Sequence, residues 1–144
     1  MLAASPLWVE GVDRNMSPIP KIRWGLALLG GFLAEAGVFA VVPVALRFGE
    51  QAPLYVIPPT CLVMTFVFGF WVARRAGSRF VLHGTLVGVV AALIYIGLTV
   101  GQPLPLAYVV SHFLKVFGGM AGGFAGGRRF RRGAITDVER AQVG

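Results

Sequence analysis

The chain has 144 residues, of which 56% are hydrophobic and 13% are charged, whereas a soluble domain typically has about 25% charged residues. Length and composition exclude an ordinary soluble enzyme and a disordered tail, and they leave room for four bilayer spans of about 20 residues each. The single cysteine, Cys61, excludes an internal disulfide framework and a cysteine-rich metal site. The net charge of +7 does not indicate a nucleic-acid partner, because the basic residues flank apolar runs, as they do in membrane proteins.

Four apolar stretches follow one another along the chain, at about residues 24–46, 54–73, 80–100 and 104–127. Each stretch is long enough to cross about 30 Å of hydrocarbon as a helix. The runs are continuous rather than alternating, which favours helices over the strands of a barrel. Because the connecting segments are short, neighbouring helices should be antiparallel. We therefore predict an all-α polytopic membrane protein, with four transmembrane helices in an up-down antiparallel bundle and the lipid bilayer around it.

The two ends of the chain flank this predicted 24–127 domain. Residues 1–23 form a cytoplasmic or interfacial segment, whose apolar part is too short for a secretory signal. Translation can begin at Met1 or at Met16, and the sequence leaves both starts open. Residues 128–144 form a basic cytoplasmic tail. The tail either rests on the lipid surface or is solvated and only sets the topology; the arginines nearest the last span are Arg128, Arg129, Arg131 and Arg132.

The basic residues predict the orientation in the membrane. Eleven of the 13 lie in the N-terminal segment, in the loop at 74–79 or in the tail, whereas Arg47 is the only one in the other two loops. Positively charged loops stay on the cytoplasmic side. We therefore expect a multi-pass protein of the plasma (inner) membrane, with both termini cytoplasmic.

Two ionisable residues fall near the middle of predicted spans. Glu35 lies in the first stretch and Lys115 in the fourth, and Glu35 is the only acidic residue within any span. An ionised group at that depth costs about 2.5–3.5 kcal/mol on insertion scales. Opposite charges at matched depth predict a buried pair, with the first and fourth helices adjacent. The pair either only fixes the packing or belongs to a transport or proton-relay site, and a third reading is that the two groups do not meet.

His112 precedes Lys115 by three residues and is a candidate member of such a relay. The other histidine, His83, lies on a different predicted helix at the opposite depth. Two separated histidines with no further ligands do not make a metal site, so we expect no metal and no cofactor.

Glycines in the last two stretches predict close helix packing. In the fourth stretch they come as pairs every four residues, which gives two small-residue ridges on one helix. The third stretch has a smaller face of the same kind. The glycines concerned are Gly84, Gly88, Gly118, Gly119, Gly122, Gly123, Gly126 and Gly127.

Pro58 and Pro59 stand near the start of the second stretch. Proline lacks the N–H that would bond to the carbonyl four residues earlier. The sequence therefore predicts either a helix break that lines a cavity or a helix that begins at one of these prolines.

The segments 69–77 (GFWVARRAG) and 83–88 (HGTLVG), followed by the paired glycines, resemble the small uncharacterised four-helix membrane proteins of bacteria. This resemblance covers the last three spans and implies no activity.

The segment 29–36 (LGGFLAEA) is similar to the first helix of small multidrug resistance transporters. That resemblance implies that Glu35 is a proton-coupling carboxylate. Lys115 and the strong charge bias of the loops depart from that family's pattern, which the other helices do not show.

No nucleophile–base pair or cofactor motif is visible, so we do not expect an enzyme. The first functional hypothesis is a non-enzymatic assembly or interaction module, packed through its glycine-rich helix faces, with a second copy or another membrane protein as partner. The alternative is a small transporter or channel component that uses Glu35, Lys115 and His112 for proton- or ion-coupled movement of a solute.

Overall fold

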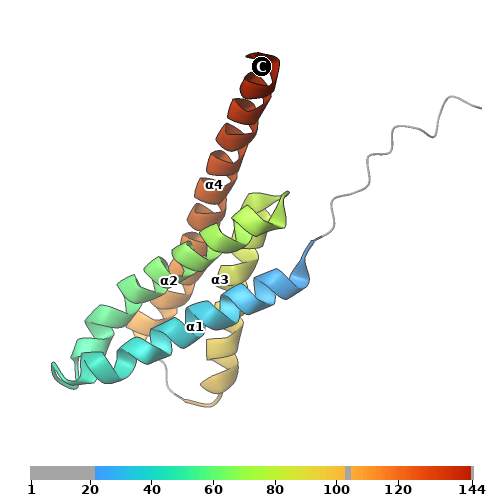
Figure 1. Ribbon diagram of the computed structural model, residues 1–144. Coiled ribbons are helices and arrows are strands. Elements are labelled where there is room, and N and C mark those ends of the chain that lie inside the picture. Colours follow the sequence, from blue (N-terminus) through green and yellow to red (C-terminus); the bar gives the residue numbers. More distant parts are fainter. Residues whose placement is uncertain (1–21, 103–104, 144) are drawn as a thin grey trace, which may run out of the picture.

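The computed structural model describes residues 22–102 and 105–143, with side chains up to residue 129. This part of the chain is helical, without strands (Figure 1). The helices are α1 (Trp24–Leu46), α2 (Ala52–Ala76), α3 (Phe80–Leu98) and α4 (Leu106–Val143). The all-α prediction is confirmed.

In the described part of the chain, α1, α2 and α3 are long and apolar enough to cross a membrane. The helix α4 is not among these candidates, although its first half was predicted as a span. Its apolar run is interrupted by Ser111, His112 and Lys115 and by a series of glycines, which lower its hydropathy.

Helix ends differ from the predicted spans by a few residues. The predicted second span, 54–73, lies within the longer α2, and α3 ends at Leu98. Gly77 ends α2 in the left-handed conformation (φ 74°), which glycine adopts without a steric cost. The predicted tail is not separate from the last helix, because α4 continues through the arginines to Val143 and extends beyond the other helices (Figure 1).

The central elements of the bundle are α2 and α3. They pack against each other, and each also packs against both α1 and α4. In Figure 1, α1 crosses in front of this pair and α4 lies behind it. Among the described residues, the backbones of α1 and α4 do not approach each other closely, and the two helices meet only through side chains. The expected adjacency of the first and fourth helices is therefore wrong for their backbones.

The glycines of α4 explain this arrangement, because each ridge approaches a different helix. A Cβ on Gly118 or Gly122 would overlap the carbonyl oxygen of Leu62 or Phe66 in α2. A Cβ on Gly119 would overlap the carbonyl oxygen of Gly84 in α3. The remaining glycines extend the same two contacts, Gly126 toward α2, Gly123 and Gly127 toward α3, and Gly84 and Gly88 from α3 back toward α4. The helix α4 is thus wedged between α2 and α3, at backbone contact with both.

The expected break at Pro58 and Pro59 is not present, since α2 runs unbroken from Ala52 to Ala76. Nor does the helix begin at either proline. Pro53 occupies its first turn, where a missing N–H costs no helical hydrogen bond. Because Pro58 and Pro59 lack an N–H, two carbonyl oxygens of the first turn have no helical hydrogen bond. The rest of the helix keeps its hydrogen bonds and continues past the prolines.

We predict that Gly122→Ala destabilises the bundle by about 1–3 kcal/mol, the range for overpacking a tightly packed site. The new methyl group would overlap the Phe66 carbonyl oxygen. The measurement is the free energy of unfolding in detergent micelles, followed by loss of the helical circular dichroism signal. Gly97→Ala is the matched control, because no described atom lies within 4 Å of a Cβ there. Equal effects of the two changes would contradict the wedge.

Candidate functional site

Glu35 and Lys115 form a buried ion pair at the centre of the bundle. The Lys115 Nζ lies 2.7 Å from the Glu35 Oε2, and each side chain is 2% exposed. Glu35 comes from α1 and Lys115 from α4, two helices whose described backbones do not approach each other closely. The two side chains therefore meet between α2 and α3, each from its own side. This ion pair stands where we expected the two helices to pack directly.

Small residues on the inward face of α1 bring Glu35 to this position. Ala27, Gly30, Gly31 and Ala34 are buried on the same face. A Cβ on Gly31 would overlap Val90 of α3, and one on Gly30 would overlap Val72 of α2. Because these residues are small, α1 packs closely against both α2 and α3, and the carboxylate of Glu35 reaches the centre of the bundle.

Tyr95 of α3 lies beside the ion pair. Its ring centroid is 4.7 Å from the Lys115 Nζ, a cation–π geometry. The ring also stacks with Phe39 of α1, at 6.4 Å, and with Tyr108 of α4, at 5.9 Å. This aromatic cluster covers part of the ammonium group. Tyr95 was not predicted as a site residue, because a tyrosine in a predicted span carries no signal that separates this role from ordinary packing.

His112 lies on the other side of Tyr95. The two ring centroids are 5.2 Å apart, with the planes tilted by 56°. Both imidazole nitrogens are buried without a hydrogen-bond partner in the described part of the chain, and so is the Glu35 Oε1. The structure thus brings all three predicted site residues to one region, where Tyr95 contacts both His112 and Lys115. Buried polar atoms usually have a partner, so these three atoms need an explanation.

The nearby hydroxyl groups do not supply one. The Ser111 Oγ donates to the carbonyl oxygen of Ala107 at 2.8 Å. The Thr65 Oγ1 donates to the carbonyl oxygen of Cys61 at 2.7 Å. Each hydroxyl is therefore bonded within its own helix, one turn back.

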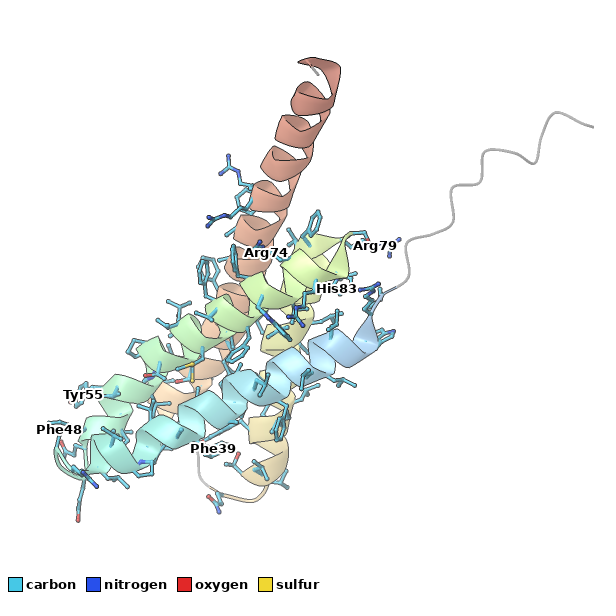
Figure 2. The ribbon with its side chains drawn as sticks, in the orientation of Figure 1. Phe39, Phe48, Tyr55, Arg74, Arg79 and His83 are labelled. Atoms are coloured by element: carbon cyan, nitrogen blue, oxygen red, sulfur yellow. The ribbon has the colours of Figure 1, made fainter. Side chains whose placement is uncertain are left out.

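His83 has a different role at the arginine-bearing end of the bundle (Figure 2). The backbone N–H of Arg23 donates to its Nε2 at 3.1 Å, and its Nδ1 lies 3.1 Å from the carbonyl oxygen of Arg79. Since Nε2 accepts, Nδ1 must donate, which makes the ring neutral with its proton on Nδ1. The fully buried imidazole therefore ties the start of α1 to the start of α3. These hydrogen bonds could not be predicted from the sequence, because in each of them the partner of His83 is a backbone group.

The remaining predicted residues occupy the surface or lie outside the described side chains. Arg128 and Arg129 are exposed. The side chains of Arg131 and Arg132 are outside the described residues. Among the residues that the structure describes, no three His, Cys, Asp or Glu side chains gather as metal ligands would.

Comparisons of this chain with protein families, with curated proteins and with solved structures find no match.

We predict that Glu35→Gln and Lys115→Met each destabilise the bundle by about 3–5 kcal/mol, because each leaves an unpaired buried charge. The double variant should recover much of that loss. The measurement is a double-mutant cycle on the free energy of unfolding in detergent. Glu50→Gln, an exposed acidic residue, is the control and should have little effect. Strictly additive losses would show that the two groups do not interact.

Proposed function

We propose that the chain crosses the plasma membrane four times as an up-down bundle, with both termini cytoplasmic. The hydrogen bonds of His83 and a bond from the Arg23 Nη1 to the Arg75 carbonyl oxygen (3.0 Å) support this arrangement. They hold the start of α1, the end of α2 and the start of α3 at one end. Arg74 and Arg79 lie at that end in Figure 2, whereas Phe48 and Tyr55 lie at the other. A one-sided arginine distribution is typical of a cytoplasmic face.

The proposed fourth span is α4, which by itself is poorly suited to hydrocarbon. Its lysine is neutralised by Glu35, and its glycine backbone is covered by α2 and α3. These contacts favour insertion of α4 as part of the bundle.

The function that this geometry supports best is a non-enzymatic assembly module of the membrane. The observation that carries the proposal is the ion pair, which joins the two helices whose described backbones stay apart and so helps to hold the bundle as one body. The glycine ridges serve contacts inside the chain and are not free for a partner. The outer stripe of α1 is instead available, with the large exposed side chains Trp24, Leu28 and Phe32 spaced one turn apart.

Crosslinking in native membranes tests this proposal. Phe32→Cys should give a crosslinked species, with a second copy or another membrane protein, when a bifunctional thiol reagent is added. Cys61 is buried, so the introduced thiol is the reactive one. Leu93→Cys on α3 is the matched control at a site with 61% exposure, and it should give markedly less product. A strict monomer at both positions would count against an assembly role.

A second candidate function is proton- or ion-coupled movement of a solute. It is favoured by the Glu35 Oε1 and the two nitrogens of His112, which have no hydrogen-bond partner among the described residues and lie in the same region as Tyr95 and Lys115. A proton that binds at the Oε1 would neutralise Glu35 and release Lys115 from its partner. The buried pair would then open and close as the carboxylate loses and regains its charge.

A flux assay separates the two candidates. In liposomes with an imposed proton gradient, a relay predicts proton flux by the wild-type protein, and flux at the protein-free background for the Glu35→Gln/Lys115→Met double variant. Tyr55→Phe, at an exposed position, should leave the flux unchanged. Equal flux by the wild-type protein and a folded double variant would contradict the relay and leave the pair with a structural role.

A further inference from the structure

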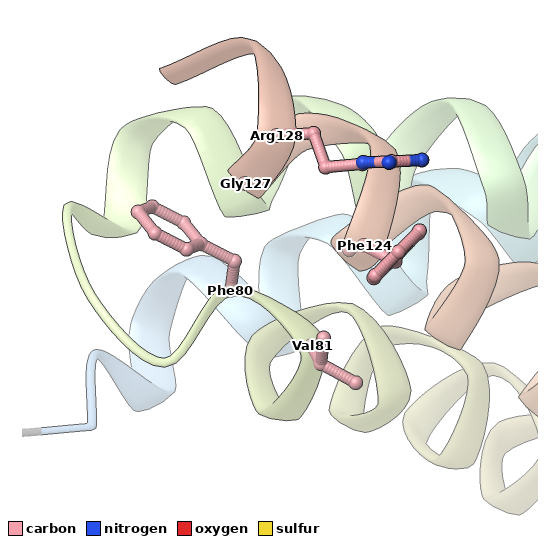
Figure 3. Close-up of a pocket in the computed structure, with 6 residues that line it drawn as sticks. Phe80, Val81, Phe124, Gly127 and Arg128 are labelled. Carbon is pink, nitrogen blue, oxygen red and sulfur yellow. The ribbon is translucent and has the colours of Figure 1, made fainter. Parts of the chain in front are cut away.

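A groove runs along the outer surface between α3 and α4, at the arginine-bearing end (Figure 3). Its first part is a hollow of about 220 Å³ between the start of α3 and one face of α4. Gly123 and Gly127 line it where α4 comes close to Phe80 of α3. The other lining residues are Phe80, Val81, Phe124 and Arg128.

The groove continues along α4 toward the middle of the bundle. A second hollow of about 330 Å³ shares the lining residues Val81 and Phe124 with the first, so the two are neighbours on the same surface. Its other lining residues are Phe117, Met120 and Ala121, and all five side chains are apolar. Between Phe117 and Arg128, α4 rises about 16 Å at 1.5 Å per residue. The groove is therefore a long apolar track.

Positive charge is concentrated at one end of this track. The guanidinium of Arg128 lies 5.1 Å from the Phe124 ring centroid, which holds it beside the groove (Figure 3). The helix α3 begins at the same place, and its N-cap residue, Arg79, makes no side-chain cap. A helix N-terminus carries a partial positive charge that favours anions. Among the side chains that the structure describes, no acidic residue lines either hollow.

We propose that this groove binds one anionic phospholipid. The phosphate group lies against Arg128 and the N-terminus of α3, and one acyl chain lies along the track past Val81 and Phe124. Charge at one end and an apolar lining along the rest match the two parts of such a lipid. The inference rests on the proposal that α4 spans the membrane, which places Arg128 at the depth of the lipid headgroups.

The charge requirement is tested with a matched pair of arginines. Delipidated protein in detergent is titrated with phosphatidylglycerol or phosphatidylcholine, and bound lipid is counted by native mass spectrometry. We expect wild-type protein to bind one phosphatidylglycerol in preference to phosphatidylcholine. Arg128→Gln should weaken phosphatidylglycerol binding about fivefold, the order expected for one basic group near an anionic headgroup. Arg129→Gln removes the same charge one residue away, outside the groove lining, and should change binding less than twofold.

The apolar track is tested by filling it. Val81→Trp should reduce binding of both lipids, because Val81 lines both hollows. Val63→Trp, at an exposed position on α2, is the control and should leave binding unchanged. Equal losses in the Arg128 and Arg129 variants, or no loss in Val81→Trp, would overturn the proposal.

Carbonate extraction of cell membranes distinguishes failure of this inference from failure of the proposed function. If the protein stays in the membrane but shows none of these differences, the lipid site is wrong and the membrane assignment stands. If carbonate releases the protein, both proposals fail.

Discussion

A carboxylate from α1 and an ammonium group from α4 meet at the centre of this bundle, and the other packing features are arranged around them. The two helices stand on opposite sides of α2 and α3, so only long side chains can join them. Glu35 and Lys115 meet this requirement, and each offsets much of the other's desolvation. Apolar residues of the same reach would leave the helices free to slide, whereas one donor and one acceptor fix their relative depth.

The central helices, α2 and α3, pack against α4 and against α1 in different ways. Toward α4, the contact is backbone on backbone, through the glycines Gly84 and Gly88 and those of α4 itself. Toward α1, the contact is made by small residues such as Ala27, Gly30 and Ala34, which leave its bulky residues on the outer surface. Close approach on both sides shortens the distance across the bundle, and this is what allows one glutamate and one lysine to span it.

Much of this fold follows from the sequence, because the apolar runs are long and their charges are sparse. The contact between Glu35 and Lys115 could be predicted because no other acidic residue lies in a predicted span. Which helices are adjacent could not be predicted, since a pair of charges does not reveal whether two backbones or two extended side chains cover the distance. The continuous helix at Pro58 was missed because sequence rules treat the missing N–H as a stop, although the first turns of a helix tolerate it. The tie through His83 depends on a backbone N–H, which has no sequence signature.

The unbroken course of α4 has a mechanical consequence. Lys115 and Val143 belong to one helix, and 28 residues at 1.5 Å each separate them by about 42 Å along its axis. The glycine contacts hold α4 against α2 and α3 as far as Gly127, so about 24 Å of the helix, from Gly127 to Val143, extends past them. A bend of 10° at Gly127 would move the far end by about 4 Å, on the same rise per residue.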